Sequence, residues 1–200
     1  MIFVITGPSG CGKSTLVKHV LEMLDDVEFS VSHTTRTKRN GEVEGKDYYF
    51  VSKEEFEQMI RKGKLLEWAL VHGQHYGTSK RELEKKSGKD LLLDIDVQGA
   101  EQVKDRFKKA VFVFILPPVF KELRRRLEKR GDMNPAAIRK RLDTAKKEIR
   151  YYSTFDCLII NDKLEQAVEE LKAIILSSRC RLEARQKEIL PILRSFTEER

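Results

Sequence analysis

The sequence predicts an α/β fold, in which helices cover a parallel sheet that is interrupted by an inserted antiparallel lobe. Short apolar runs alternate with stretches of helical periodicity over most of the 200 residues, which is the pattern of a parallel sheet with helices on both faces. This alternation stops between residues 30 and 80, where strand-like runs follow one another. The length corresponds to one domain that carries additional lobes.

The predicted core contains four buried strands, and helices connect them. The first strand, Ile2–Thr6, is followed by a helix from Ser14 to Leu24, whose apolar residues recur at helical spacing on one face. Three more β-rich runs follow at Leu91–Asp94, Val111–Leu116 and Cys157–Ile160. Helical stretches are predicted at about 97–107, 118–130 and 135–150 and from about residue 163 onward.

The inserted lobe is predicted to span residues 31–81. Strand-like runs occur at Glu28–Ser32, Tyr48–Val51 and Leu65–Val71, with a helix at about 53–62. Residues 34–47 form a polar stretch, and a loop of this length inside a domain is usually functional or disordered. Three helix starts show the spacing of a capping box, at Ser52 with Glu55, Ser79 with Glu82 and Asp162 with Glu165.

The formal net charge of +7 is concentrated in one part of the chain. Residues 121–150 hold 12 Lys and Arg and 5 Asp and Glu, whereas the other 170 residues hold 27 of each. A basic excess usually indicates an anionic partner such as a phosphate, a nucleic acid or a membrane surface. Because the excess is confined to one helical segment, it favours a local phosphate site over an extended polyanion-binding surface.

Several classes of protein are excluded by composition. The longest apolar run, Ala110–Leu116, is far shorter than a membrane-spanning helix requires, and the N-terminus lacks the pattern of a signal peptide. Cys11, Cys157 and Cys180 are too few and too scattered for a disulfide framework, and no metal-type spacing is present. We therefore expect a cytoplasmic protein with reduced thiols that binds neither membrane nor nucleic acid.

A phosphate-binding motif lies directly after the first predicted strand. It reads Gly7-Pro8-Ser9-Gly10-Cys11-Gly12-Lys13-Ser14, continues into Thr15, and fits the pattern G-x-x-x-x-G-K-[ST]. Glycines allow backbone N–H groups to close around phosphate oxygens, and the N-terminus of the following helix adds partial positive charge. Lys13 is expected to reach the β- and γ-phosphates and Ser14 to bind Mg²⁺, so the motif predicts a nucleoside triphosphate site.

Further motifs give the chain a resemblance to a known family. They are Ser32-His-Thr-Thr-Arg36-Thr-Lys-Arg39-Asn-Gly-Glu42, Gly45-Lys-Asp-Tyr48, Glu67-Trp-Ala, Tyr76-Gly-Thr78 and Asp94-Ile-Asp96-Val-Gln98-Gly99. In this order the set resembles guanylate kinase, which phosphorylates GMP with ATP, from Ile2 to about Cys180. The resemblance implies a P-loop core, a nucleoside-monophosphate-binding lobe at 31–81 and a lid at 122–150, with residues 1–30, 82–121 and 151–200 forming the core.

The resemblance assigns an acceptor site to the inserted lobe. Two arginines three residues apart suit a phosphate monoester, because each guanidinium donates a bidentate pair of hydrogen bonds. One carboxylate can accept from both N1–H and the 2-amino group of guanine, and Glu67 matches the family residue that does so. The GMP-binding residues implied by the resemblance are Ser32, Arg36, Arg39, Glu42, Tyr48, Glu67, Tyr76, Thr78 and Asp96.

Two further groups of residues complete the expected active site. Asp94 ends a buried strand beside the phosphate loop, where an acidic residue typically holds the Mg²⁺ that accompanies ATP. Basic residues of the lid would neutralise the transferring phosphoryl group. The catalytic residues implied by the resemblance are Lys13, Arg126, Arg130 and Arg141, with Ser14 and Asp94 at the metal and Asn161 at the adenine ring.

These observations predict an ATP:GMP phosphotransferase that acts on GMP and dGMP as a monomer or homodimer. The first alternative is another nucleoside monophosphate kinase, or a kinase of a ribosyl phosphate, on the same core. The second is a non-catalytic guanylate-kinase-like module that binds proteins, against which Lys13, Ser14 and the lid arginines argue. The third is a basic nucleic-acid-binding protein, which would spread its basic residues along a surface.

Overall fold

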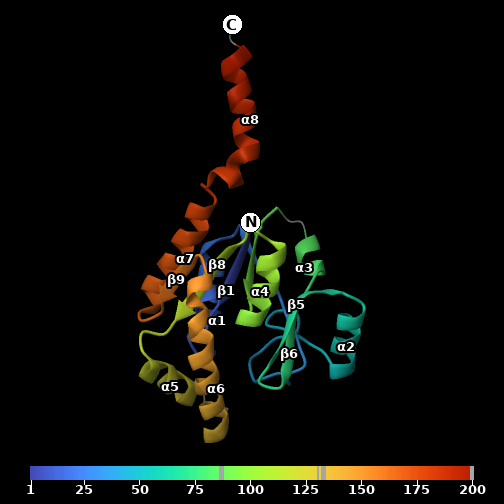
Figure 1. The fold of residues 1–200 in the computed structure, drawn as a ribbon, viewed down its shortest axis with the longest axis vertical. Coiled ribbons are helices and arrows are strands. Elements are labelled where there is room, and N and C mark those ends of the chain that lie inside the picture. The colour runs from blue at the N-terminus through green and yellow to red at the C-terminus, as the bar shows by residue number, and fades with distance from the viewer. Residues whose placement is uncertain (86–87, 130, 132–133, 199–200) are drawn as a thin grey trace.

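The computed structural model describes residues 1–85, 88–129, 131 and 134–198, and it consists of a core, an inserted lobe and two projecting helical segments (Figure 1). The core sheet has five parallel strands in the order β2-β7-β1-β8-β9. These strands are β1 (Ile2–Thr6), β2 (Val27–Phe29), β7 (Asp90–Asp94), β8 (Val111–Leu116) and β9 (Cys157–Ile160). The predicted α/β class is confirmed.

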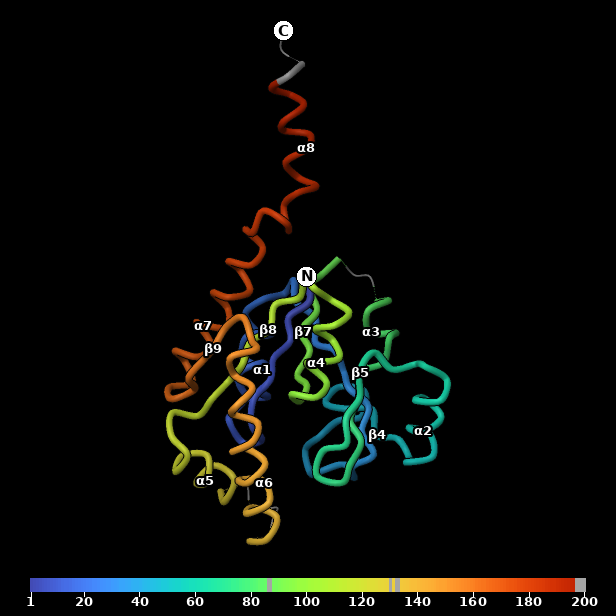
Figure 2. The backbone as a smooth tube through the Cα atoms, viewed as in Figure 1, coloured from blue at the N-terminus to red at the C-terminus, as the bar shows by residue number. Residues whose placement is uncertain are grey.

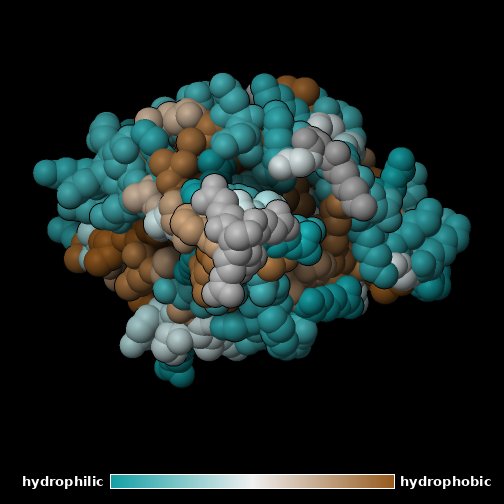
Figure 3. All heavy atoms as spheres, turned by 90° about the horizontal axis from the view of Figure 1, so that it is seen from above, coloured by the Kyte–Doolittle hydropathy of each residue, from teal (hydrophilic) through white to brown (hydrophobic). Residues whose placement is uncertain are grey.

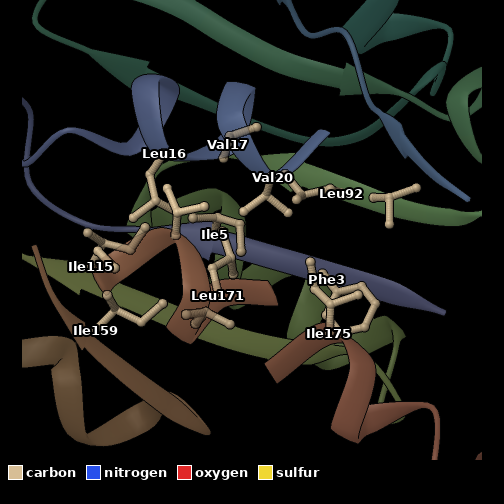
Figure 4. Close-up of a cluster of buried hydrophobic side chains, with 14 of the residues drawn as sticks. Phe3, Ile5, Leu16, Val17, Val20, Leu92, Ile115, Ile159, Leu171 and Ile175 are labelled. Atoms are coloured by element: carbon tan, nitrogen blue, oxygen red, sulfur yellow. The ribbon is translucent and has the colours of Figure 1, made fainter. Parts of the chain in front are cut away.

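Helices cover both faces of this sheet because its strands are apolar on both sides. Phe3 and Ile5 of β1 point into a cluster with Leu16 of α1 (Lys13–Met23) and Leu171 of α7 (Leu164–Ser178) (Figure 4). Val4 points the opposite way, into a second cluster that is covered by α4 (Val97–Arg106). The two clusters fix the core sheet, and the carboxyl ends of its strands carry the candidate site.

The inserted lobe contains a second sheet in the order β4-β3-β6-β5. Its strands are β3 (His33–Thr34), β4 (Tyr49–Phe50), β5 (Leu65–Val71) and β6 (Gln74–Ser79), and α2 (Lys53–Arg61) packs beside them (Figure 2). The β5–β6 and β3–β6 pairs are antiparallel, as predicted, whereas β3 and β4 are parallel. The lobe sheet is therefore mixed at its β4 edge. A short helix, α3 (Arg81–Glu84), leads back to the core.

The strand predicted at Glu28–Ser32 forms only at its start, because residues 30–32 lie between a strand of the core sheet and a strand of the lobe sheet. Val27–Phe29 pairs with β7 in the core, and His33–Thr34 pairs with β6 in the lobe. Ser30 still donates its N–H to the Leu92 carbonyl at 2.9 Å, so the crossing begins directly after it. Residues 30–32 thus link the core sheet to the lobe sheet.

Of the three predicted capping boxes, only the one at Ser52 forms. Ser52 Oγ accepts the Glu55 N–H at 3.1 Å, and the Glu55 carboxylate accepts the Ser52 N–H at 2.8 Å. Glu82 instead accepts the N–H of Val31 at 3.1 Å, and α7 begins after Lys163 without a side-chain cap. Both of those predictions were wrong, because tertiary contacts and a one-residue shift in the helix start displaced the expected caps.

Replacing Ser52 with alanine should destabilise the protein by about 1 kcal/mol, the usual effect of removing such a cap. The change leaves the Glu55 N–H at the start of α2 without its hydrogen-bond acceptor. Urea unfolding of the variant would measure it, with the exposed neighbour Lys53→Ala as the control. A midpoint for Ser52→Ala equal to that of the control would contradict the assignment.

The lid region and the C-terminus are helical. α5 (Phe120–Lys129) and α6 (Pro135–Glu148) pack against each other through Leu123, Leu127, Leu142 and Ala145, and the 3₁₀ turn η1 (Ile149–Thr154) follows. α8 (Leu182–Glu198) extends away from the core (Figure 1). Viewed along this direction, the surface is mostly hydrophilic (Figure 3). Over the described residues, none of the helices has the length and apolar character needed to cross a membrane.

Candidate active site

Three glycines determine the course of the loop between β1 and α1. Gly7, Gly10 and Gly12 have φ values of 151°, 93° and 98°, which side chains rarely adopt. A Cβ atom at Gly7 would lie 2.2 Å from the carbonyl oxygen of Ile115, and one at Gly12 would lie 2.3 Å from Nδ2 of Asn161. Glycine is therefore required at both positions by conformation and by space, and the loop backbone packs directly on the ends of β8 and β9.

The other loop residues have structural contacts that fit this course. The Pro8 carbonyl accepts the N–H of Cys11 at 3.1 Å, which closes the turn. Burial raises the pKa of the Cys11 thiol, so this side chain stays neutral and fills space below the loop. Thr15 is exposed in the first turn of α1.

Lys13 folds back over the loop and donates from Nζ to the Gly7 carbonyl at 2.7 Å. Burial acts to lower its pKa, but the neighbouring Cys11, Asp94 and Glu148 outweigh this and raise it. The side chain is therefore an ammonium group at neutral pH. Its charge lies at the N-terminus of α1, where the backbone N–H groups also favour an anion.

Ser14 and Asp94 meet beside Lys13 because β1 and β7 are adjacent parallel strands. Asp94 is in register with Ile5 at the carboxyl ends of the two strands, and Ser14 Oγ donates to Asp94 Oδ2 at 3.3 Å. Burial raises the pKa of Asp94, and the charge of Lys13 and the Ser14 hydrogen bond oppose that rise. A hydroxyl and a carboxylate are hard oxygen donors, which is the ligand type that Mg²⁺ prefers.

Arg126 of α5 holds the lid against the loop backbone. Its Nη1 donates to the Cys11 carbonyl at 3.1 Å and its Nη2 to the Asn161 carbonyl at 2.9 Å, while Glu122 accepts from Nε at 2.8 Å. The Asn161 amide donates to the same Cys11 carbonyl at 2.8 Å. The structure thus brings two predicted residues, Arg126 and Asn161, together behind the phosphate loop.

Arg141 reaches the loop from α6. Its Nη1 donates to Ser9 Oγ at 2.7 Å, so this guanidinium contacts the loop directly. Asn134 caps α6 by accepting the N–H of Ala137 at 2.8 Å. The third predicted lid arginine, Arg130, lies outside the described residues.

The inserted lobe brings a second group of charged and hydroxyl side chains together around Arg36. Glu42 accepts a bidentate pair from Arg36 at 2.7 and 3.0 Å, and the Tyr76 hydroxyl accepts from Arg36 Nε at 3.2 Å. Glu42 also accepts the backbone N–H of Arg39 at 2.8 Å. Burial acts to raise the pKa of Glu42, but the Arg36 and Arg39 contacts lower it. Glu42 is thus an ionised group that holds Arg36 in place.

Tyr48 completes this group of side chains. The Arg36 guanidinium lies 5.4 Å from the centre of the Tyr48 ring, and the rings of Tyr48 and Tyr76 pack edge to face at 5.9 Å. Burial and the charge of Asp94 raise the pKa of Tyr48, so its hydroxyl stays protonated. A neutral hydroxyl donor beside an arginine suits a phosphate dianion.

Glu67 lies on β5 with its side chain buried in the lobe. Thr78 of β6 donates its N–H to Glu67 Oε1 at 2.7 Å, and the Ser32 and Thr78 hydroxyls are 3.3 Å apart. Burial, together with the charge of Asp96, raises the pKa of Glu67 to about 7, although the Thr78 hydrogen bond opposes the rise. The carboxylate therefore has capacity to accept further hydrogen bonds.

Asp96 connects the two halves of the site. Its side chain caps α4 by accepting the Gly99 N–H at 2.8 Å. Burial raises its pKa, while the bonds from Gly99 and Gln98 and the charge of Lys13 oppose this. The charge of Asp96 thus acts on Lys13 of the phosphate loop and on Glu67 of the lobe.

A cavity of about 290 Å³ opens between the β5–β6 hairpin, α4 and α6. It is lined by Leu70, Val71, His72, Gly73, Gln98, Lys140, Thr144 and Glu148. The sequence interpretation missed Glu148, whose charge acts on Lys13 and Asp96 and whose buried Oε2 has no hydrogen-bond partner among the described residues. Its spacing of seven residues from Arg141, which places both on one face of α6, was the signal that could have identified it.

Comparisons with known proteins agree with this arrangement. The family model of guanylate kinase matches residues 1–178. A guanylate kinase from Geobacter metallireducens is 49% identical over 183 residues, which cover 90% of each chain. One from Thermotoga maritima is 46% identical over 190 residues, covering 94% of this chain and 92% of the relative.

A solved structure agrees as well. The crystal structure of guanylate kinase from Anaplasma phagocytophilum superposes with a TM-score of 0.77 at 35% identity, and the match covers 90% of this chain and 87% of that one. The sequence motifs, the fold and these relatives point to the same conclusion. The chain belongs to the guanylate kinase family.

Proposed function

We propose that this protein transfers the γ-phosphoryl group of MgATP to GMP, giving ADP and GDP. The single observation that carries the proposal is that residues 94–99 contact both halves of the site, since Asp94 accepts from Ser14 Oγ at 3.3 Å and Gly99 lies against the Glu67 carboxylate. A triphosphate on the loop and a purine monophosphate in the lobe would therefore face each other. The acceptor phosphate oxygen attacks the γ-phosphorus in line, and ADP leaves.

On the donor side, the loop N–H groups and the start of α1 bind the phosphates of ATP. Lys13 neutralises the charge of the β- and γ-oxygens, and Arg141 stabilises the transferring group from the lid side. We keep Arg126 as a catalytic residue of the lid and Asn161 as a contact of the adenine ring, and both donate to the Cys11 carbonyl of the loop. We also infer that Arg130 contributes to the lid.

The residues beside the loop fit a magnesium ion. Ser14 and Asp94 supply hard oxygen donors that already face each other at 3.3 Å. They would hold Mg²⁺, which neutralises charge on the β- and γ-phosphate oxygens. The charge of Lys13 opposes the rise in the pKa of Asp94 that burial causes.

On the acceptor side, the phosphate of GMP is bound by Arg36, Arg39, Tyr48 and Tyr76. Glu42 keeps the Arg36 guanidinium oriented through its bidentate pair. Glu67 accepts N1–H and the 2-amino group of guanine, and Ser32 and Thr78 contribute hydroxyls at the base. Adenine presents a lone pair at N1 and has no 2-amino group, so the same carboxylate rejects it.

Catalysis then depends on positioning and charge neutralisation, and it proceeds without a covalent intermediate. The protein would act in the cytoplasm, where both nucleotides and reduced thiols occur, and Cys11, Cys157 and Cys180 are free thiols in this structure. Its existence as a monomer or homodimer stays a prediction. The bounds of the lobe at 31–81 and the lid at 122–150 belong to the same proposal.

An acceptor panel tests the proposed function. With saturating MgATP, we expect kcat/KM for GMP to exceed the values for AMP, UMP and CMP by a factor on the order of 10³ or more, because a buried carboxylate left unpaired is costly. Coupled ADP formation provides the measurement. Equal or faster turnover of AMP would refute guanine recognition and favour another nucleoside monophosphate kinase on the same core.

The pH dependence of GMP use provides a separate prediction. The pKa of Glu67 is about 7 before GMP binds, and only the ionised carboxylate accepts both guanine donors. Affinity for GMP should therefore rise as the pH increases through 7, and kcat/KM should fall by up to about tenfold per pH unit below it. The KM for ATP should not share this change.

The phosphate of GMP itself titrates near pH 6, so this pH profile needs a matched variant. Glu67→Gln keeps the phosphate titration and removes the carboxyl titration. A change near pH 7 that persists in Glu67→Gln would show that another group is responsible.

A further inference from the structure

Gly99 is a glycine at a position where a helix would ordinarily favour alanine. It lies in the first turn of α4, is buried, and its φ is outside the left-handed region. Alanine is the better helix former by roughly 1 kcal/mol, so the backbone offers no reason for glycine here. Its N–H donates to Asp96 at 2.8 Å, and alanine would keep that bond. The reason must therefore lie in the space that the missing side chain leaves.

The Glu67 carboxylate occupies that space. A Cβ atom at Gly99 would lie 2.3 Å from Glu67 Oε2, closer than non-bonded atoms approach, and 3.1 Å from its Cδ, tighter than most such contacts. The other oxygen, Oε1, accepts the Thr78 N–H at 2.7 Å. Since the clash involves the end of a flexible side chain, an added methyl group would displace the carboxylate and leave the helix intact.

Gln102 of α4 binds the backbone of β5, the strand that carries Glu67. Its Nε2 donates to the Trp68 carbonyl at 2.7 Å, and its Oε1 accepts the Trp68 N–H at 3.3 Å. Trp68 directly follows Glu67 on β5. Gly99 and Gln102 are three residues apart, so both lie on the face of α4 that packs against β5. Helix α4 thereby contacts β5 at two points: Gln102 binds the Trp68 backbone, and Gly99 lies against the Glu67 carboxylate.

We propose that α4 is the positioning element for guanine recognition in this protein. Gly99 leaves the space in which the Glu67 carboxylate lies, and Gln102 holds the β5 backbone that carries it. Both act through Glu67, so they are positioning residues. This inference rests on the proposed function, because it assumes that Glu67 accepts the two guanine donors.

A comparison of GMP with IMP as acceptors tests whether Gly99 and Gln102 position the Glu67 carboxylate. Hypoxanthine keeps N1–H but lacks the 2-amino group, so IMP offers Glu67 one donor and GMP offers two. A displaced carboxylate loses the geometry for two parallel hydrogen bonds. We therefore expect the ratio of kcat/KM for GMP to that for IMP to fall at least about tenfold in Gly99→Ala, the usual effect of one charge-assisted hydrogen bond.

The experiment measures kcat and KM for GMP and IMP at saturating MgATP. It compares the wild type with Gly99→Ala and with the matched control Glu101→Ala, which adds an alanine on the exposed face of the same helix. Gly99→Ala should raise the KM for GMP, move its pH profile toward that of Glu67→Gln, and leave the KM for ATP within about twofold. Glu101→Ala should retain wild-type values, and thermal unfolding should show both variants folded.

A GMP-to-IMP ratio that is unchanged in folded Gly99→Ala overturns the positioning role. If Gly99→Ala does not fold, Gln102→Leu decides, because it removes both bonds to Trp68: a reduced ratio supports the inference and an unchanged ratio overturns it. Failure of the proposed function looks different, since the wild type itself would then use GMP and IMP equally.

Discussion

Replacing Lys13 with methionine should lower kcat for GMP phosphorylation by about 10³-fold or more, which is the scale of losing a charged group at a developing phosphoryl charge. Lys13 is an ammonium group held over the loop by its bond to Gly7. Methionine has a similar length and no charge, so it fills the same space without neutralising the β- and γ-phosphates. Steady-state ADP formation with saturating ATP and GMP would measure the effect.

The matched control for this substitution is Lys18→Met. Lys18 belongs to the same helix, and its side chain is 76% exposed on the solvent face. It should retain wild-type kcat. Activity of Lys13→Met within tenfold of the control would contradict the assignment of the loop as the triphosphate site.

Replacing Arg141 with methionine should also reduce kcat by about 10³-fold, the lower end of the range for arginines that stabilise transferring phosphoryl groups. Arg141 reaches over the loop from α6 and donates to Ser9 Oγ at 2.7 Å. Because its contribution is greatest when charge develops during transfer, the KM values for ATP and GMP should change much less than kcat. A full kinetic comparison of the two substrates measures this split.

Arg139→Met provides the control, since Arg139 is exposed on the same helix two residues earlier. This variant should behave as the wild type does. A large rise in the KM for ATP with an unchanged kcat in Arg141→Met would assign Arg141 to ground-state binding and contradict its role in transfer.

Most of the core could be predicted from the sequence because each element carries its own periodic signal. The runs at Ile2–Thr6 and Val111–Leu116 are apolar on both faces, as strands covered by helices must be. The phosphate loop was recognisable for a similar reason, because its glycine and lysine spacing follows from the local shape that phosphate binding requires. The resemblance to the guanylate kinase family, based on ordered motifs, is confirmed by the relatives.

The rest depends on long-range contacts that leave little local pattern. β6 (Gln74–Ser79) was not predicted, because it is polar and owes its conformation to pairing with β3 and β5. Arg126 was identified as a lid residue, but its bonds to the loop and to Asn161 span residues that are far apart in the chain. Gly99 was part of a recognised motif, yet its purpose emerged only when Glu67 was placed beside it.

The basic excess of residues 121–150 was also predictable only in part. Its confinement to residues 121–150 was visible in the sequence, and it favoured a phosphate site on a lid. The structure adds which charges face the loop and which do not. Arg126 and Arg141 contact the loop, whereas Arg125 forms an exposed pair with Glu122. One basic segment therefore contains arginines that contact the loop and arginines that face solvent, and their spacing in the sequence does not distinguish the two.

In the proposed reaction, one phosphoryl group passes from ATP to GMP. The most direct measurement is chromatographic separation of the nucleotides after the wild-type protein has acted on MgATP and GMP together. We expect ADP and GDP to appear in equal amounts and only when both substrates are present. ADP released with inorganic phosphate and without GDP, or no GMP-dependent ADP at all, would contradict the account.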